Sequence, residues 1–472
     1  MGPTPDAVII GAGPNGLAAA ITLARAGRSV TVYEAASTPG GGCRSAELIE
    51  PGFVHDICAA VHALGVSSPF FRDTPLDQYG LRWCHPEVPL AHPLDEGRAG
   101  VATHPIDGTL DALGTDAARY RRVVGPLVRR FDALTDSVLA PVLRIPRHPV
   151  VLARFGIPAL LDAAHLAKWF GELGGPLFAG CAAHSILPLE RPLTSSFGLM
   201  LLSSAHAVGW PFAQGGSQAI IDAMVAYLRS LGGEVVCDHP VRSLTDLAPS
   251  SVVLADVSPS VLGSIAADRL PPSFMTQAAR FRHGPGVFKI DYTLDGPVPW
   301  TNDACRRAGT VHVGGSVAEI AASERTMSRG GHSDRPFVLV AQPTIADPSR
   351  APAGKHTLWT YCHVPANSTV DMTDAIELQL ERFAPGFRDL VRGRHTMDAP
   401  AYERYNQNYI GGDIAGGAHN GRQLLARGTS IRPYRTGAES ILLCSASTPP
   451  GAGVHGMCGV QAAKVALRTT LR

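Results

Sequence analysis

Two glycine-rich hexapeptides of the pattern G-x-G-x-x-G stand near opposite ends of the 472-residue chain. The first, GAGPNG, occupies residues 11–16, and the second, GAGVHG, occupies residues 451–456. Glycines at this spacing let the backbone approach a pyrophosphate at the amino end of a helix, where free N–H groups point at the ligand. The pattern predicts dinucleotide binding, and its two copies indicate either two nucleotide sites or one site formed by both ends.

The elements around the first copy are those of a dinucleotide-binding unit. Apolar residues at 6–10 predict a short strand that ends at Gly11. Residues 17–27 have a helical composition with a glycine stop, and β-branched residues at 29–34 predict a second strand. Strand, glycine turn, helix and strand therefore follow one another in about 30 residues, as the motif requires.

Each glycine of the first copy has its own expected role. Gly11 permits the tight turn, Gly13 lets the backbone approach a pyrophosphate, and Gly16 lets helix and strand pack closely. Glu34 follows Gly16 by 18 residues, where a carboxylate accepts hydrogen bonds from both ribose hydroxyls. Because that carboxylate would repel a 2′-phosphate, NADP is not expected at this site.

The second copy has a different context. A strand is predicted at 440–444, and the 16 residues after Gly456 have room for one helix only. Since neither a second strand nor a ribose carboxylate follows, a self-contained dinucleotide fold is excluded. We expect this loop to face a second part of the same ligand, as a two-part ligand such as FAD would require. The alternative is a glycine-rich turn that merely closes the domain.

The composition of the chain indicates which classes of binding partner to expect. The 41 Lys and Arg residues balance 40 Asp and Glu residues, for a net charge of +1, so nucleic acid is not expected as a partner. Charged residues make up 17% and apolar residues 45% of the chain, whereas about 25% charged residues is typical. Such a chain has more apolar surface to cover, either with core or with an apolar ligand.

Targeting and redox patterns favour the cytoplasm. The start, MGPTPDAVIIGAG, has no basic segment and only a short apolar run, so a signal peptide is not expected. No run of 18 apolar residues predicts a spanning helix. The nine Cys residues are scattered without a C-x-x-C pair, which is typical of reduced thiols. We expect a cytoplasmic protein, and peripheral contact with a membrane stays open.

Two stretches carry a resemblance to known flavoproteins. EAASTPGGGCRSAELIEPGF (34–53) resembles the second signature of glutathione-reductase-like FAD proteins, although it has three glycines at 40–42 where two are usual. CSASTPPGAGVHGMCG (444–459) resembles the C-terminal flavin motif of the phytoene desaturase family. Nearly the whole chain resembles a bacterial branch of that family of NAD(P)/FAD-dependent oxidoreductases, close to the pyridine nucleotide-disulfide oxidoreductase domain-containing proteins and within the wider flavin amine oxidase superfamily.

The resemblance implies a fold. It is α/β, with a glutathione-reductase-like Rossmann FAD-binding domain and a discontinuous second α+β substrate domain. The FAD-binding domain is expected at 1–75, 205–265 and 425–472, and the substrate-binding domain at 76–204 and 266–424. One noncovalent FAD is the expected cofactor.

The resemblance and the glycine pattern together propose a set of site residues. The expected cofactor-binding residues are Gly11, Gly13, Pro14, Asn15, Gly16, Glu34, Ala35, Gly41, Gly42, Arg44, Ser45, Val241, Ser447, Gly453, Val454, His455 and Met457. The expected substrate-binding residues are Asp56, His62, Trp210, Tyr409 and Asp413, and the expected catalytic residues are Lys289 and His455.

Lys289 has two interpretations. Residues 287–294 alternate like a strand, with Lys289 in phase with Asp291, and by periodicity alone Lys289 is a solvated residue paired with Asp291. Flavin amine oxidases carry a similar strand with a Trp further along, and its Lys holds a water against flavin N5. Lys289, Ile290 and Trp300 match that arrangement, which implies that Lys289 faces the flavin.

The resemblance also implies a reaction. Hydride would pass between a carbon of an apolar substrate, polyene or lipid-like, and flavin N5, as in a desaturase or dehydrogenase, with oxygen or a quinone as the electron acceptor. Three alternatives stay open: a flavin-dependent isomerase without net redox change, an amine oxidase, and an FAD-bound binding protein without turnover.

Residues 148–175 are apolar with a polar stripe of Arg154, Asp162, His165 and Lys168 at helical spacing. Three interpretations compete for this helical segment: a core-facing helix, the wall of a tunnel for an apolar substrate, and a patch that rests on a membrane. Pro158 is expected to interrupt the first turn of this segment.

The sequence has no motif for a metal site, a serine nucleophile or a redox-active dithiol. The 18 His residues include no H-E-x-x-H motif and no paired Cys/His spacing, so no metal site is expected, and no G-x-S-x-G elbow occurs. Cys43, Cys444 and Cys458 lie near the flavin motifs but form no redox pair by spacing, so dithiol chemistry is not expected.

Overall fold

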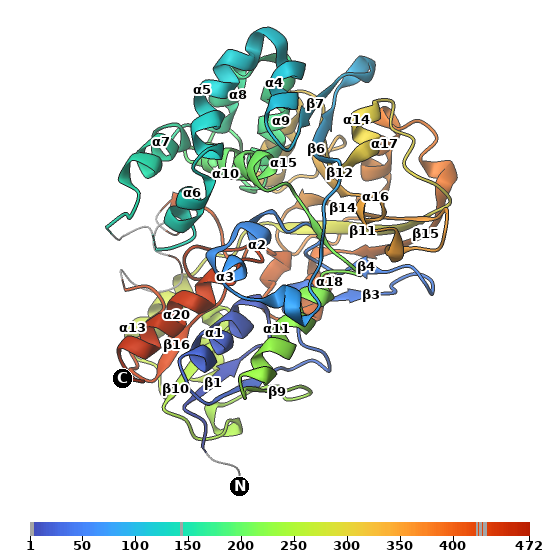
Figure 1. Ribbon diagram of the computed structural model, residues 1–472. Coiled ribbons are helices and arrows are strands. Elements are labelled where there is room, and N and C mark those ends of the chain that lie inside the picture. Colours follow the sequence, from blue (N-terminus) through green and yellow to red (C-terminus); the bar gives the residue numbers. More distant parts are fainter. Residues whose placement is uncertain (1–3, 142–144, 422, 424–426, 428–431) are drawn as a thin grey trace.

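The computed structural model describes residues 4–141, 145–421, 423, 427 and 432–472. Two β-sheets organise it: a five-stranded sheet in the half that holds both termini, and a seven-stranded sheet in the other half (Figure 1). A layer of helices, α4 to α10, stands beside the larger sheet. The site lies where these three parts meet.

The smaller sheet is parallel and buried. Its strand order is β16-β10-β1-β2-β9, and all neighbours pair in parallel. Its strands are β1 (Ala7–Ile10), β2 (Val30–Tyr33), β9 (Glu234–Val236), β10 (Val252–Ala255) and β16 (Ile441–Leu443). Short apolar runs such as AVII and VVLA form these strands because a sheet covered on both faces buries side chains on both sides.

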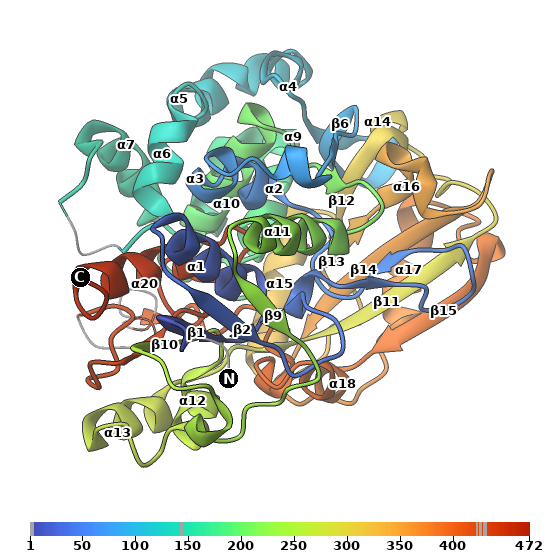
Figure 2. The same cartoon turned by 60° about the horizontal axis from the view of Figure 1, so that its bottom comes forward.

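Helices cover both faces of the parallel sheet (Figure 2). On one face α1 (Pro14–Arg25) contacts both α11 (Gln218–Ser230) and α20 (Met457–Arg468). On the other face α12 (Pro259–Ile265) and α13 (Pro272–Arg280) share an apolar core with the strands. The strand, turn, helix and strand predicted from the first glycine copy are all present.

The helix α20 packs closely against α1 because of two glycines, Gly456 of the second copy and Gly459 in the first turn of α20. A Cβ at Gly459 would collide with the Asn15 carbonyl oxygen, and a Cβ at Gly456 would lie 2.8 Å from Ala18 Cβ. Neither position accommodates a side chain, so the amino ends of the two helices pack closely side by side. Within the described residues the second copy forms no nucleotide fold of its own and instead joins the first.

The larger sheet is mixed, with strand order β15-β11-β14-β13-β12-β6-β7. Its strands are β6 (Val88–Pro93), β7 (Ala99–Ala102), β11 (Gly286–Leu294), β12 (Ala308–Val313), β13 (Val338–Ala341), β14 (His356–Val364) and β15 (Val391–Met397). Neighbours pair antiparallel except β12 and β6, which pair in parallel.

The two faces of the larger sheet differ. Phe288, Ile290 and Tyr292 of β11 point into an apolar core shared with α17 (Thr373–Phe383). Lys289 and Asp291 alternate onto the other face, so the predicted strand phase is confirmed. That second face looks toward the helical layer and the cavity.

The helical layer consists of α4 (Asp107–Leu113), α5 (Ala117–Val128), α6 (Phe131–Val138), α7 (Pro149–Ala159), α8 (Ala163–Trp169), α9 (Gly171–Ala183) and α10 (Thr194–Ala207). The stretch 148–175, expected to present one polar stripe, is therefore divided among three helices. Asp162 begins α8 by accepting the His165 N–H, and Gly171, with φ of 75°, begins α9. The helix α7 continues through Pro158 and ends one residue later.

The remaining elements are short connectors and cover. The strand pairs are β3 (Ser45–Ala46) with β4 (His55–Asp56) and β5 (Trp83–Cys84) with β8 (Phe212–Ala213). The other α-helices are α2 (Ala63–Ser67), α3 (Pro69–Arg72), α14 (Asp303–Arg307), α15 (Val317–Ser328), α16 (Pro343–Ala346) and α18 (Ala399–Tyr405).

The fold class predicted from the sequence is confirmed: an α/β fold with a parallel Rossmann sheet and a separate second sheet. The five parallel strands fall within 1–75, 205–265 and 425–472, and the seven mixed strands fall within 76–204 and 266–424. The exact domain boundaries stay a prediction.

No single helix in the described ranges is long and apolar enough to cross a membrane, and α7 and α8 pass that test only together, across a bend of 101°. All nine Cys side chains are free thiols. Burial raises the pKa of the Cys458 thiol to about 12, so this side chain near the second glycine copy is not a reactive thiolate.

Candidate cofactor and substrate cavity

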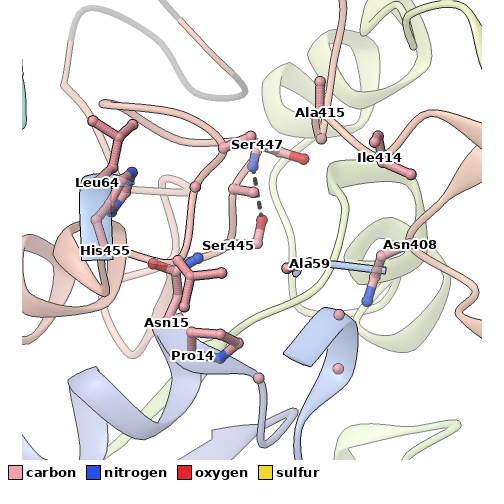
Figure 3. Close-up of a pocket in the computed structure, with 18 of the residues that line it drawn as sticks. Pro14, Asn15, Ala59, Leu64, Asn408, Ile414, Ala415, Ser445, Ser447 and His455 are labelled. Carbon is pink, nitrogen blue, oxygen red and sulfur yellow. Dashed lines mark hydrogen bonds between the residues drawn. The ribbon is translucent and has the colours of Figure 1, made fainter. Parts of the chain in front are cut away.

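One cavity of about 1060 Å³ runs from the first glycine turn to the helical layer. Its nucleotide end is lined by the glycine turn and the residues around Glu34, its middle by a loop at 445–455, and its far part by apolar side chains. Figure 3 shows the middle, where Pro14, Asn15 and His455 lie close together. Ligand pockets usually measure about 300–1,000 Å³, so this cavity has room for a cofactor and a substrate.

Glu34 ties the end of β2 to the glycine turn. Its Oε2 accepts the Ala12 N–H at 2.8 Å, while its Oε1 accepts the Ala36 N–H at 3.0 Å and a guanidinium N–H of Arg44 at 3.2 Å. The residue is 8% exposed and lines the cavity. A carboxylate held in this way keeps lone pairs for ribose hydroxyls, which fits its predicted role.

The glycines of the first copy divide between two tasks. Gly11 and Gly13 line the cavity, together with Pro14 and Asn15. Gly16 does not line it, and a Cβ there would collide with the Gly11 carbonyl oxygen. Gly16 therefore serves the close packing of the turn on the helix, as predicted. Its expected contact with the cofactor stays a prediction.

The nucleotide end also holds a carboxyl group that the sequence analysis missed. Asp256 follows β10 directly, lines the cavity, and accepts the Gly16 N–H at 2.8 Å. Burial raises its pKa to about 7, with the Gly16 amide opposing this rise. The available signal was a polar residue at the carboxyl end of a buried strand, which is where ligands bind in open parallel sheets.

The glycine run at 40–42 forms the next part of the wall. Gly41 has φ of 54°, and its missing Cβ would lie 3.3 Å from Gly13 Cα. The Tyr405 hydroxyl donates to the Gly41 carbonyl at 2.8 Å, and the Tyr409 hydroxyl fills the space beside Gly42. Tyr409, predicted to touch substrate, lines the cavity at its nucleotide end. Arg44 lines the same wall.

At the side of the cavity where adenine is expected, the backbone after β9 hydrogen-bonds to the backbone after β2. The Asp238 N–H donates to the Ala36 carbonyl at 3.0 Å, and the His239 N–H donates to the Glu34 carbonyl at 2.9 Å. This pairing brings Val241 into the cavity lining beside Ala35. The contact of Val241 with adenine, which the resemblance implies, stays a prediction.

His455 holds the middle loop in shape. Its Nδ1 accepts the Met457 N–H at 3.0 Å, and its carbonyl accepts the Ser68 hydroxyl at 2.6 Å. Burial lowers the pKa of His455 to about 4, so the imidazole is neutral at neutral pH with its proton on Nε2. His455 lines the cavity, but its bonds are those of a residue that positions the loop.

The other predicted loop residues separate into two groups. Ser447, Gly453 and Val454 line the cavity, and the Ser447 N–H donates to Ser445 Oγ at 3.3 Å (Figure 3). Met457 does not line it, because it is the first residue of α20 and its side chain is buried in the core. Met457 is therefore corrected to a core residue.

Ser45 and Asp56 belong to a buried polar cluster outside the cavity lining. Asp56 accepts the Ser45 hydroxyl at 2.6 Å, the Ser217 N–H at 2.7 Å and a guanidinium N–H of Arg350 at 2.6 Å. Burial acts to raise the pKa of Asp56, but Arg350 and the hydrogen bonds lower it below its ordinary value. The expected cofactor role of Ser45 and substrate role of Asp56 are thus corrected, because both side chains are used in joining the two sheets' loops.

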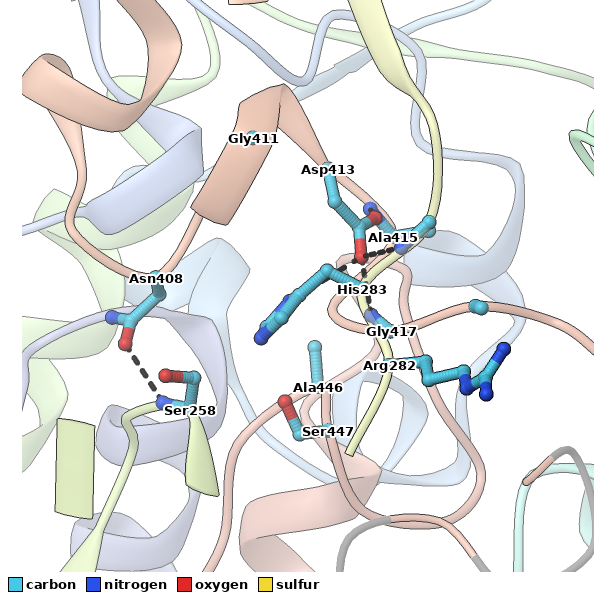
Figure 4. Close-up of polar contacts among 12 residues, drawn as sticks. Ser258, Arg282, His283, Asn408, Gly411, Asp413, Ala415, Gly417, Ala446 and Ser447 are labelled. Atoms are coloured by element: carbon cyan, nitrogen blue, oxygen red, sulfur yellow. Dashed lines mark hydrogen bonds and ion pairs between the residues drawn. The ribbon is translucent and has the colours of Figure 1, made fainter. Parts of the chain in front are cut away.

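Asp413 has a similar structural role (Figure 4). Its carboxylate accepts the N–H groups of Ala415 and Gly417, each at 2.8 Å, and that of Gly284 at 2.7 Å. The side chain is fully buried and does not line the cavity. Asp413 therefore shapes the backbone that carries Ala415 to the cavity, and the predicted substrate contact is corrected.

His62 and Trp210 are in the cavity wall, as predicted for substrate residues. Burial lowers the pKa of His62 to about 4, and its Nε2 bonds Ser217 Oγ at 2.8 Å while its Nδ1 has no partner. Trp210 donates its indole N–H to Ser204 Oγ at 2.9 Å, which fixes the ring against the cavity.

Lys289 is buried beside two cavity-lining residues, Trp359 and Tyr361, on the same face of the larger sheet. It is fully buried in an ion pair with Asp291, and its ammonium lies 5.8 Å from the ring of Trp359, which lines the cavity. The predicted pairing is present, but the predicted solvation is wrong. Lys289 itself does not line the cavity, although it stands on the same face of the sheet as Trp359, which belongs to the neighbouring strand. The expected position of Lys289 at the flavin stays a prediction. Trp300 packs in the core on the opposite face of the sheet.

The far part of the cavity, here called the apolar chamber, was not predicted residue by residue. It is lined by Leu152, Phe155, Ala159, Leu160, His184, Leu193, Phe197, Met200, Trp210, Leu339, Trp359 and Tyr361. These residues come from α7, α10, β13, β14 and adjoining loops, which are distant in sequence. The tunnel-wall interpretation of 148–175 agrees with the position of α7. Among the described residues no three His, Cys, Asp or Glu side chains are arranged to hold a metal ion.

Comparison with known proteins agrees with this geometry. A family model described as an NAD(P)-binding Rossmann-like domain matches residues 9–73. Pyridine nucleotide-disulfide oxidoreductase domain-containing protein 2 of Rattus norvegicus is 26% identical, covering 99% of this chain and 94% of that protein. Phytoene dehydrogenase of Streptomyces griseus is 28% identical, covering 77% of this chain and 74% of that protein. The chain is homologous to phytoene desaturase-like oxidoreductases.

Solved structures share the fold. An oxidoreductase from Methanosarcina mazei superimposes with a TM-score of 0.66 at 16% identity, covering 97% of this chain and 99% of that chain. Cyclohexylamine oxidase from Brevibacterium oxydans superimposes with a TM-score of 0.60 at 16% identity, covering 99% of both chains. The likeness at this identity concerns the arrangement of the two sheets and the helical layer.

Proposed function

We propose that this protein binds one FAD along the cavity and transfers hydride between that cofactor and a carbon of an apolar substrate. The observation that carries the proposal is the continuity of one cavity from Glu34 and the glycine turn, past the loop at 445–455, to the apolar chamber. A cofactor with a nucleotide at one end and a reactive ring at the other fits that sequence of surroundings.

The residues present fit such a cofactor. Glu34 would accept the ribose hydroxyls, and Gly13 and Gly41, which have no side chains, leave the wall open for a pyrophosphate beside the amino end of α1. The loop at 445–455 and the amino end of α20 would lie beside the ring, where the helix dipole stabilises negative charge. When bound, FAD supplies the acceptor or donor of the hydride.

The chain's own residues define what reaches the ring. Trp210, Trp359 and Tyr361 present aromatic surface to the chamber, which favours an apolar substrate and excludes water. His62 and His455 are neutral at neutral pH because burial lowers each pKa to about 4. These two imidazoles therefore add no charge to the cavity wall, which suits an apolar substrate.

Desaturation or dehydrogenation is the form of the reaction that we favour, because the homologous Streptomyces protein is named as a phytoene dehydrogenase. A flavin-dependent isomerase, an amine oxidase and a binding protein without turnover are the other candidates. Oxygen or a quinone is the candidate electron acceptor.

Anaerobic spectra of the FAD-loaded protein test the proposal. We expect an apolar unsaturated or saturated substrate to bleach the flavin absorption with stoichiometric product. Product without bleaching would indicate isomerisation, and bleaching by amines only would indicate an amine oxidase. If no apolar compound or amine changes the spectrum, or if the purified protein contains no FAD, the proposed oxidoreductase activity is wrong.

We further propose that a lipid bilayer lies at the outer end of the chamber and that the protein is a cytoplasmic, membrane-peripheral one. Six apolar side chains between residues 145 and 169 are exposed, and we call them the apolar rim: Ile145, Val150, Ile157, Leu160, Leu161 and Trp169. Leu160 belongs to both the rim and the cavity lining, although it is 65% exposed. Because Arg147, Arg154 and Lys168 are exposed beside the rim, it combines apolar and cationic groups as interfacial segments do.

A further inference from the structure

We infer that the apolar chamber selects a neutral substrate with one oxygen-containing polar group, a hydroxyl or a carbonyl, and that His184 binds that group. This inference rests on the proposed function, because it concerns the substrate of the same cavity. A substrate of this kind is neither a carboxylate nor an amine, and it differs from a pure hydrocarbon by its one polar group.

The side chains of His184 and His312 form a pair of imidazoles, and His184 is the member that lines the chamber. It follows the last residue of α9 and lines the cavity. Its Nε2 lies 3.1 Å from the Nε2 of His312, a fully buried residue of β12. With Nε2 engaged in this way, Nδ1 of His184 has no hydrogen-bond partner among the described residues and is left for a ligand.

The imidazole pair shares one proton between the two Nε2 atoms, so it has two arrangements. If His312 donates, His184 carries its proton on Nδ1 and presents a donor to the chamber. If His184 donates, its Nδ1 presents an acceptor. A hydroxyl can use either arrangement, and a carbonyl can use the first. Burial lowers the pKa of His184 to about 3, so neither arrangement carries a charge at neutral pH.

The position of the pair follows from the register of the larger sheet. His312 pairs with Leu339, and Leu339 pairs with Tyr361, so these three residues form one row across β12, β13 and β14. Leu339 and Tyr361 line the cavity. Trp210 packs 6.3 Å from the ring of His184 and 5.7 Å from that of His312, which fixes the imidazoles beside this apolar surface.

The charges that line the cavity lie at its other end. The lining residues with a full charge, or with a carboxyl group, are Glu34, Arg44, Arg242, Asp256 and Arg404. They adjoin the glycine turn, the strand ends or α18, whereas the described residues that line the chamber include no Lys, Arg, Asp or Glu. A carboxylate or ammonium placed in the chamber would therefore lack a counter-ion, which is costly in an apolar site.

Four ligands with one apolar body test the inference: decane, decanol, decanoate and decylamine, titrated calorimetrically into the FAD-loaded protein. We expect decanol to bind roughly tenfold more tightly than the other three, the effect of one hydrogen bond to a buried partner. The His184→Phe variant keeps a ring of similar size, and we expect it to bind decanol no more tightly than decane.

The matched control is His92→Phe. His92 belongs to the same buried imidazole cluster and bonds the Gly315 carbonyl at 2.7 Å, but it does not line the cavity, so its removal should leave the preference for decanol intact. Equal binding of decane and decanol by the unchanged protein would overturn the inference, as would tightest binding of decanoate or decylamine. Neither result touches the proposed function, which fails instead if FAD is absent or no compound bleaches it.

Discussion

The two ends of the cavity are built in opposite ways. At the nucleotide end, the backbone and a few charged groups do the work, and Glu34 alone connects the end of β2, the glycine turn and Arg44. In the apolar chamber, side chains from separate helices and strands form the wall, and its imidazole, His184, is neutral. The difference teaches that the cofactor is specified by local sequence, whereas the substrate is specified by packing.

The largest expected effect is at the nucleotide end. In Gly13→Val a branched side chain would stand where a pyrophosphate must lie, since even a Cβ there comes within 2.9 Å of Asp256 Oδ2. We expect the purified variant to have lost nearly all flavin absorption per chain. Gly263→Ala in α12, where a Cβ meets no atom closer than 3.5 Å, is the control and should stay yellow. A fully yellow Gly13→Val protein would show that this turn does not bind the cofactor.

The next-largest effect is expected at the buried ion pair of Lys289 and Asp291. Lys289→Met leaves the buried Asp291 carboxylate without its cation, and we expect the free energy of unfolding to fall by about 3–5 kcal/mol. FAD should stay bound because Lys289 does not line the cavity. Replacing both residues, as Lys289→Met with Asp291→Leu, should restore most of the stability in denaturant titrations. Equal losses in the single and double variants would mean that the uncompensated charge is not the cause.

A pH dependence should distinguish the nucleotide end from the chamber. Burial raises the pKa of Asp256 to about 7, so its carboxyl group is neutral below that pH and anionic above it. The anion would repel a pyrophosphate, and we expect the dissociation constant of FAD to rise by roughly tenfold between about pH 6 and about pH 8. Asp256→Asn should remove that rise. The same slope in both proteins would assign the dependence to another group.

The smallest effect is expected at the apolar rim. Replacing Ile157 and Leu161 by Ser removes two side chains that are 73% and 47% exposed, and co-sedimentation with phosphatidylcholine–phosphatidylglycerol vesicles should fall several-fold. The matched control replaces Val370 and Leu378, which are 45% and 58% exposed in and near α17. Equal losses in the two double variants would mean that the rim has no special affinity for lipid.

The same contrast explains what could be predicted from the sequence. Glu34, Gly13 and Val241 could be proposed from the sequence because a strand end, a turn and a family resemblance each mark a position along the chain, and all three line the cavity. Asp56 and Asp413 were misassigned because a carboxylate beside a motif looks the same in sequence whether it faces a cavity or accepts backbone N–H groups. His184 was not selected because its partner His312 is 128 residues away and no pattern links them.

Lys289 shows how far a resemblance reaches. Periodicity correctly predicts that Lys289 is in phase with Asp291. The resemblance correctly predicts that Lys289 is not a solvated residue. Whether Lys289 lines the cavity depends on its neighbours Trp359 and Tyr361, which the neighbouring strand β14 contributes. Cross-strand placement of this kind follows from register, which a single sequence does not display.

The most direct test of one cavity with one cofactor is the nucleotide content of the purified protein. Denaturation followed by chromatography of the released cofactors should give one FAD per chain and no NAD, because the second glycine copy packs on the first and forms no separate site. Two nucleotides per chain, or a retained NAD in place of FAD, would contradict the account.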